Sequence, residues 1–166
     1  MVGSGRLLRE PPRIKALEAA AAVAEGRVER LSSSCFRVRS SDGSRVYTVY
    51  VDPGRGLAYS SDNGTRLRGY KGYPIIAALI LQGLVPYDPQ VGEALRGVPW
   101  RSLNERLKSY RRVLEEVKRR ARARGLPPER LEEYMDRVAE ALRRISLRLL
   151  PQPPLECTAR RGEEPA

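Results

Sequence analysis

The segment around Asp42 and Gly43 constrains the fold more than any other part of this sequence. An Asp-Gly pair favours the tight turn of a β-hairpin, and here it separates two strand-like stretches at residues 28–39 and 45–51. The second stretch, Arg-Val-Tyr-Thr-Val-Tyr-Val, consists almost entirely of β-branched and aromatic residues, which favour strands. The sequence therefore predicts an antiparallel hairpin that turns at Asp42 and Gly43.

The turn also predicts the register of the hairpin. Residues that lie opposite each other share a face of a sheet, so Val38 pairs with Tyr47 and Phe36 pairs with Val49. We expect these four side chains to pack against helices. The other face would then be an exposed surface that presents Arg37, Arg39, Thr48 and Tyr50.

Further elements complete a predicted core. A second turn at residues 52–56 leads to a short strand at 57–61, which gives an antiparallel β-meander. Apolar spacing and the placement of proline and glycine predict helices. The polar, glycine-containing segment 60–73 is expected to be an exposed loop. The predicted helices of this part lie at residues 13–24, 74–84 and 88–96.

The pattern changes from Leu103 onward. Apolar residues recur at alternating steps of four and three up to Ala121 and again from Leu131 to Leu149, which is a heptad pattern. The Gly-Leu-Pro-Pro sequence at 125–128 separates the two seams, which predicts an antiparallel, coiled-coil-like helical hairpin. We expect this hairpin to form a homo-oligomer, a dimer or a tetramer. The apolar residues expected to mediate it include Leu107, Leu114, Leu142 and Leu149.

These elements predict the α+β class: a small antiparallel β-meander packed on helices, followed by a C-terminal helical hairpin. The length of 166 residues suits one domain or a small core with an extension. We expect the core at 13–100, the hairpin at 101–150, and flexible tails at 1–12 and 151–166. No apolar run approaches the roughly 20 residues of a membrane span, so we expect a cytoplasmic protein without a membrane partner.

The charge of the chain predicts a polyanionic partner. The 31 Lys and Arg residues exceed the 20 Asp and Glu residues, which gives a net charge of +11. Residues 36–73 hold seven basic and three acidic residues and six of the ten aromatic residues. Unpaired bases stack on such rings while phosphates meet the cations, so we expect binding of single-stranded DNA or RNA. The expected contact residues are Arg37, Arg39, Tyr50, Arg66, Arg68, Tyr70, Lys71 and Tyr73.

The first helix of the predicted hairpin carries a further excess of positive charge. Residues 101–125 contain ten basic and three acidic residues, whereas residues 128–150 contain five of each. The basic helix either contacts phosphates or a partner, or pairs with acidic residues across the hairpin, and both interpretations stay open. The acidic candidates are Glu129, Glu132, Glu133 and Asp136.

Catalytic constellations are weak in this sequence. The chain has no histidine and two cysteines, which excludes imidazole base chemistry and thiolate-cluster zinc sites. Asp42, Asp52 and Asp62 could be ligands of a metal-dependent nuclease, but aspartates in turns normally accept local backbone hydrogen bonds. Without a histidine base, Cys35 is expected to be packed or idle. We therefore expect no enzyme, cofactor or metal; a protein-interaction scaffold is the alternative, and a nuclease is the least favoured.

Five short motifs and the Arg- and Leu-rich helices after them carry a family resemblance over most of residues 13–149. The motifs are Arg45-Val46-Tyr47, Ser61-Asp62-Asn63-Gly64-Thr65, Arg68-Gly69-Tyr70, Gly72-Tyr73-Pro74 and Pro99-Trp100. In this layout the chain resembles the ThermoDBP and ThermoDBP-related proteins of thermophilic archaea. The resemblance implies a sheet-and-helix domain that binds single-stranded DNA or RNA, with C-terminal helices used for oligomerisation.

Overall fold

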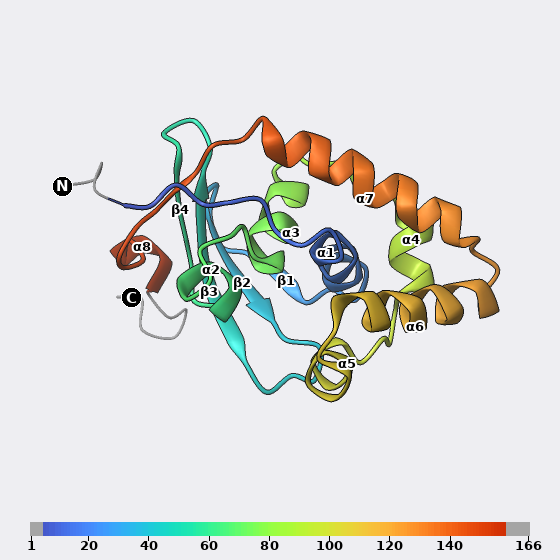
Figure 1. The fold of residues 1–166 in the computed structure, drawn as a ribbon. Coiled ribbons are helices and arrows are strands. Elements are labelled where there is room, and N and C mark those ends of the chain that lie inside the picture. The colour runs from blue at the N-terminus through green and yellow to red at the C-terminus, as the bar shows by residue number, and fades with distance from the viewer. Residues whose placement is uncertain (1–4, 159–166) are drawn as a thin grey trace.

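A five-stranded sheet forms one side of the molecule, and helices pack against it (Figure 1). The computed structural model describes residues 5–158. The spatial order of the strands is the order of the chain, and neighbouring strands are antiparallel from β1 to β4. The strands are β1 (Val28–Arg30), β2 (Cys35–Arg39), β3 (Val46–Asp52), β4 (Leu57–Ser60) and β5 (Arg148–Leu149).

The predicted register of the β2–β3 hairpin is confirmed. Val38 lies opposite Tyr47 and Phe36 opposite Val49. Phe36, Val38 and Val49 are fully buried and belong to the main core, because every second residue of each strand faces the helices. Tyr47 is half-buried and packs at the edge of this core.

The predicted antiparallel meander is present as β1 to β4, but the sheet as a whole is mixed and not purely antiparallel. β5 pairs with β4 in parallel, with Leu149 beside Ala58. The heptad spacing places Leu149 on a helix, but the last long helix ends at Arg143 and the chain then turns onto the free edge of β4. The backbone N–H of Leu150 donates to the carbonyl of Ala58 over 2.8 Å, which satisfies part of that edge.

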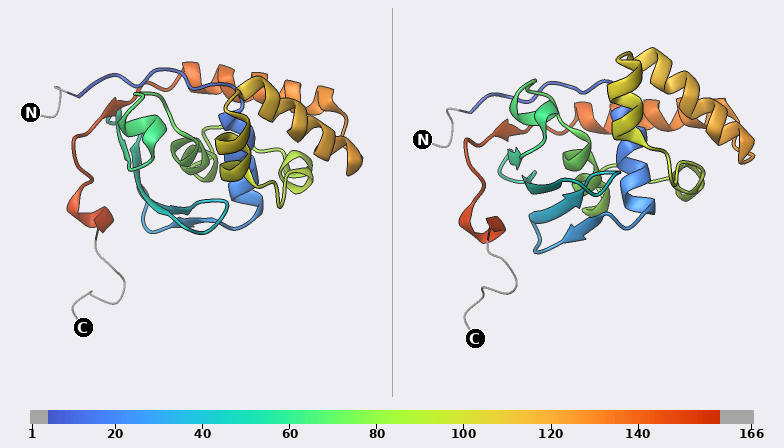
Figure 2. Two further views of the ribbon diagram at one scale, coloured as in Figure 1. Left: turned by 60° about the horizontal axis from the view of Figure 1, so that its bottom comes forward. Right: turned by 90° about the horizontal axis from the view of Figure 1, so that it is seen from below.

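Most of the helices occupy one face of the sheet and the region beyond it (Figures 1 and 2). α3 packs on β3 and β4, and α1 packs on α3, α4 and α7. The main core is one cluster that extends from Leu8 to Leu147, across the two segments that the sequence separates at residue 100. The helices of the described residues are α1 (Lys15–Ala24), α2 (Asn63–Arg66), α3 (Tyr73–Leu81), α4 (Pro89–Ala94), α5 (Trp100–Leu107), α6 (Tyr110–Ala123), α7 (Pro128–Arg143) and α8 (Leu155–Thr158).

The first heptad seam is divided between two helices. α5 ends at Lys108, which adopts a left-handed conformation with φ 52°, and α6 begins after the N-cap Ser109. The buried residues of α6 are Val113, Val117 and Ala121. α6 and α7 diverge from their connection at 124–127, and α7 packs on α1 and α4 (Figure 1).

The C-terminal segment covers part of the second face of the sheet. α8 packs on β2 and β3, and a disulfide joins Cys157 of α8 to Cys35 of β2. Around this disulfide lie Tyr50 and Leu57, both buried, as a second small core. None of the helices in the described part of the chain is long and apolar enough to cross a membrane.

The described parts of the expected flexible tails make specific contacts with the rest of the fold. Leu8 is buried, and its N–H donates to the carbonyl of Leu147 over 2.9 Å. Arg9 forms a β-bridge with Tyr70. The remaining residues of the expected tails, 1–4 and 159–166, lie outside the described residues.

Candidate functional site

A polar cleft of about 340 Å³ lies where four segments distant in sequence meet. These segments are the β2–β3 hairpin, the start of α1, the 61–73 segment with α2, and α5. The lining of the cleft includes Glu18, Arg45, Tyr47, Tyr73, Trp100 and Asn104. The volume is within the range of pockets that hold small ligands.

Two tyrosine rings lie together in the cleft. The rings of Tyr47 and Tyr73 meet edge to face, with centroids 6.2 Å apart. Burial raises the pKa of both phenols, so both are neutral at physiological pH. The pair gives the cleft an aromatic surface with polar hydroxyl tips.

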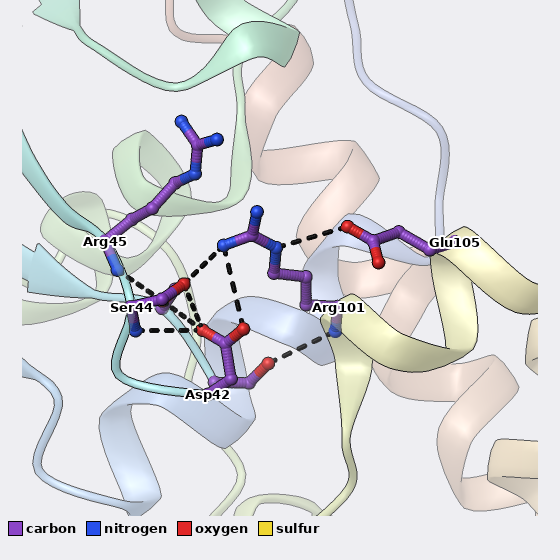
Figure 3. A network of polar contacts seen from close by, with 7 residues as sticks. Asp42, Ser44, Arg45, Arg101 and Glu105 are labelled. Carbon is purple, nitrogen blue, oxygen red and sulfur yellow. Dashed lines mark hydrogen bonds and ion pairs between the residues drawn. The ribbon is translucent and has the colours of Figure 1, made fainter.

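The hairpin turn is fixed to the start of α5 by a polar network (Figure 3). Asp42 accepts the N–H of Ser44 over 3.0 Å, and the Arg101 guanidinium lies 3.6 Å from the same carboxylate. Arg101 also donates to Ser44 and, over 3.3 Å, to Glu105. Hydrogen bonds from Ser44 and Ser40 and the charge of Arg101 hold the pKa of Asp42 well below its ordinary value of 3.8.

The side chain of Arg45, unlike that of Arg101, is not part of this polar network. Its backbone N–H donates to Ser40 over 3.0 Å. Its guanidinium points away from the Asp42 network (Figure 3) and makes no hydrogen bond or ion pair with any residue between 5 and 158. Arg45 therefore presents an uncompensated positive charge at the cleft, beside Tyr47.

Asp62 shapes the floor of the cleft. Its carboxylate caps α2 by accepting the N–H of Thr65 over 3.0 Å, and it accepts the Thr65 hydroxyl over 2.9 Å. Burial raises its pKa above 3.8 despite these hydrogen bonds. A Cβ at Gly72 would lie 2.2 Å from this carboxylate, so only glycine fits there.

A carboxylate is the least exposed charged group among the residues that line the cleft. Glu18 is 3% exposed and accepts Lys15 Nζ over 3.2 Å and Asn104 Nδ2 over 2.8 Å. Lys15 and Glu18 come from α1, whereas Asn104 comes from α5. The carboxylate thus joins two helices that the main chain connects only through 75 intervening residues, 25–99.

The expected contact residues on β2 and β3 do not form one exposed platform. Arg37 lies 3.5 Å from Glu29, and Arg39 donates to the carbonyl of Gly26 over 3.2 Å. Tyr50 is 3% exposed, because α8 and the disulfide cover it. The prediction of an exposed Tyr50 is therefore wrong.

The segment 60–73 is not an open loop either. Tyr70 is 6% exposed and Lys71 1% exposed. Lys71 Nζ donates to Glu10 over 2.7 Å and to the carbonyl of Leu142 over 2.6 Å. Arg68, Tyr70 and Tyr73 line the cleft, whereas Arg66 is exposed on α2 outside its lining.

The expected association residues have unequal surroundings. Leu142 is 1% exposed within the core of a single chain. Leu107, Leu114 and Leu149 are half-buried at the border of that core.

Sequence reasoning missed Arg45, Glu18, Trp100 and Asn104 as members of the site, and it expected Tyr47 only in the core. One signal was present in the sequence. Glu18 interrupts an apolar, alanine-rich helix, and a charged residue at such a position usually has a buried partner. The other three could be joined only by the tertiary fold.

The three turn aspartates have local roles. Asp42, Asp52 and Asp62 accept the backbone N–H groups of Ser44, Arg55 and Thr65, respectively. Among the described residues, no group of three or more Asp, Glu, Cys or His side chains is placed to hold a metal ion.

Comparison with known families identifies the family of this chain. The model of the family described as Uncharacterised conserved protein UCP014422 matches residues 8–148, and the chain belongs to this family. No curated protein and no solved structure matches the sequence or the fold.

Proposed function

We propose that this protein binds single-stranded nucleic acid, DNA or RNA, and catalyses no reaction on it. The observation that carries the proposal is the cleft, in which the rings of Tyr47 and Tyr73 lie near the unpartnered guanidinium of Arg45. Single strands are bound by rings that stack on bases and by cations that follow the phosphates. The net charge of +11 supports a polyanionic partner.

The cleft narrows the set of contact residues expected from the sequence. Arg68 and Tyr73 stay in the proposal because they line it, together with Arg45 and Tyr47. Tyr50 and Lys71 leave the proposal because both are enclosed by protein. A cavity of about 340 Å³ suits one nucleotide of a strand.

The basic residues of α6 have a smaller part in this proposal. Lys118 pairs with Glu132 of α7 over 3.3 Å, and Arg119 and Arg120 both pair with Glu116. Arg122 has no side-chain partner in the described part of the chain. Because no α6 residue lines the cleft, we assign the specific contacts to the cleft.

A salt series tests this proposal with two matched variants. Log affinity of the wild type for a fluorescent oligothymidylate should fall linearly with log salt, by about 0.7 per phosphate contact. Arg45→Ala should reduce the slope by about 0.7, whereas Arg122→Ala removes the same charge from α6 and should preserve it. Fluorescence anisotropy measures both. Salt-independent binding, equal slopes in wild type and Arg45→Ala, or equally tight binding of a duplex would contradict the proposal.

Self-association and a cytoplasmic location are carried forward as parts of the same proposal. We restrict the association surface to Leu107 and Leu114, because Leu142 is used inside one chain and Leu149 lies in β5. Disulfides persist in oxidising compartments and in the cytoplasm of hyperthermophiles. Because this chain has a disulfide, a cytoplasmic location corresponds to the second of these settings, the cytoplasm of a hyperthermophile.

A further inference from the structure

Two residues of α5 that line the cleft each carry a buried polar atom that no group among the described residues satisfies. They are the indole Nε1 of Trp100 and the amide Oδ1 of Asn104, both without a hydrogen-bond partner. Trp100 is 3% exposed, and both residues line the cleft. They lie one helical turn apart on α5, which places them on the same face of the helix. A native fold rarely leaves such groups unpaired.

The orientation of Asn104 is fixed by the groups behind it. A carboxylate only accepts hydrogen bonds, so the NH₂ group of Asn104 must face Glu18, to which it donates over 2.8 Å. Lys15 Nζ, 3.2 Å from the same carboxylate oxygen, supplies the compensating charge. The Oδ1 atom of Asn104 is therefore an acceptor, and the Trp100 indole, one helical turn away, is only a donor.

We propose that Trp100 and Asn104 receive the hydrogen-bonding edge of one unpaired base. The inference rests on the proposed function and identifies the part of the nucleic acid that the cleft reads. The Watson–Crick edge of each base carries a donor next to an acceptor, which complements Asn104 Oδ1 and Trp100 Nε1. Both protein atoms are shielded from solvent, so entry of a base requires cleft side chains to rotate.

This arrangement makes the cleft selective for single strands. In a duplex the same edge is engaged by the opposite base and cannot enter a protein pocket. Tyr47 and Tyr73 would contact the rings of the entering nucleotide, and Arg45 would contact its phosphate. An ordered water molecule is the competing partner for the two atoms, because water also donates and accepts.

Methylation of the base edge distinguishes a bound base from a bound water. Oligothymidylate and the same oligomer made of N3-methylthymine have equal charge and length, but the methylated base has lost its N3–H donor. The wild type should bind the methylated strand about 5- to 150-fold more weakly, which is the range for a well-placed base-edge contact. The salt slopes of the two strands should be equal, since no phosphate contact changes.

Three variants locate the contact. Asn104→Ala and Trp100→Phe should bind the unmodified strand more weakly, and Asn104→Ala should lose the discrimination between the strands. Trp100→Phe keeps an aromatic side chain and removes the N–H donor. Asn63→Ala is the control, because Asn63 is an exposed amide that lines the same cleft and should retain full discrimination. Circular dichroism and thermal melting identify the folded variants.

The outcomes separate this inference from the proposed function. Equal, salt-dependent binding of both strands by the wild type overturns the base-edge contact and leaves single-strand binding intact. Discrimination that persists in a folded Asn104→Ala also overturns it, because another site then reads the edge. Failure to bind either strand at low salt overturns the proposed function and this inference with it.

Discussion

Lys71 illustrates how a single residue's role depends on partners that are distant in sequence. Its place among arginines and tyrosines favours a phosphate contact. In the fold its ammonium group is enclosed and donates to Glu10 and to the carbonyl of Leu142, which are 61 and 71 residues away. Lys71 therefore ties the N-terminal segment to the end of α7, and no local spacing rule could predict either partner.

We expect Lys71→Met to lower the free energy of unfolding by about 1–3 kcal/mol, because it removes the charge-assisted hydrogen bond from Lys71 to the Leu142 carbonyl, which keeps the Ile145 N–H as a donor over 3.0 Å. Glu10, whose side chain is 46% exposed, can return to water. Urea denaturation measures the change. Arg66→Met is the control, since the Arg66 side chain is exposed and has no partner among residues 5–158, so this variant should stay within about 0.5 kcal/mol of the wild type. If Lys71→Met is as stable as the wild type but binds oligothymidylate weakly, the result contradicts the structural role of Lys71 and supports a phosphate contact.

Elements that depend on local contacts were predictable from the sequence, and those that depend on distant contacts were not. The Asp-Gly turn and the alternation of β2 and β3 predict their register correctly. The heptad spacing does not report the left-handed Lys108 that separates α5 from α6. It also cannot report β5, because that strand needs the edge of β4, about 90 residues earlier, as its partner.

The prediction of self-association is tested at Leu114 of α6. We expect light scattering of the wild type to give the mass of a dimer or a larger species, and Leu114→Glu to give a smaller one, because Leu114 is half-buried on the border of the core. Leu142→Glu should instead unfold the chain, since Leu142 is fully inside it. A monomeric wild type at high micromolar concentration would contradict self-association and leave α6 and α7 as parts of a single-chain core.

At the scale of the whole molecule, the same helices and strands form both the cleft and the main core. The cleft takes side chains from positions between Lys15 and Glu105, and the helices and strands that carry them share one hydrophobic cluster. The charge and aromatic content of the sequence predict a polyanionic partner, which stays a prediction. The site itself required the fold, because α1, the hairpin and α5 bring Glu18, Tyr47 and Asn104 together across long sequence separations.

The disulfide between Cys35 and Cys157 closes a loop with a sequence separation of 122 residues and holds α8 on the second face of the sheet. Because a long closed loop restricts the unfolded chain, we expect reduction, or Cys157→Ser, to lower the free energy of unfolding by about 2–5 kcal/mol. Urea denaturation with and without a thiol reductant measures this, and the reductant should not affect Cys157→Ser. Oligothymidylate binding by the folded variant should match the wild type, because no residue of α8 lines the cleft. If thiol titration shows the bond broken while the denaturation midpoint stays unchanged, packing around Tyr50 and Leu57 alone holds α8, and the cross-link does not stabilise the fold.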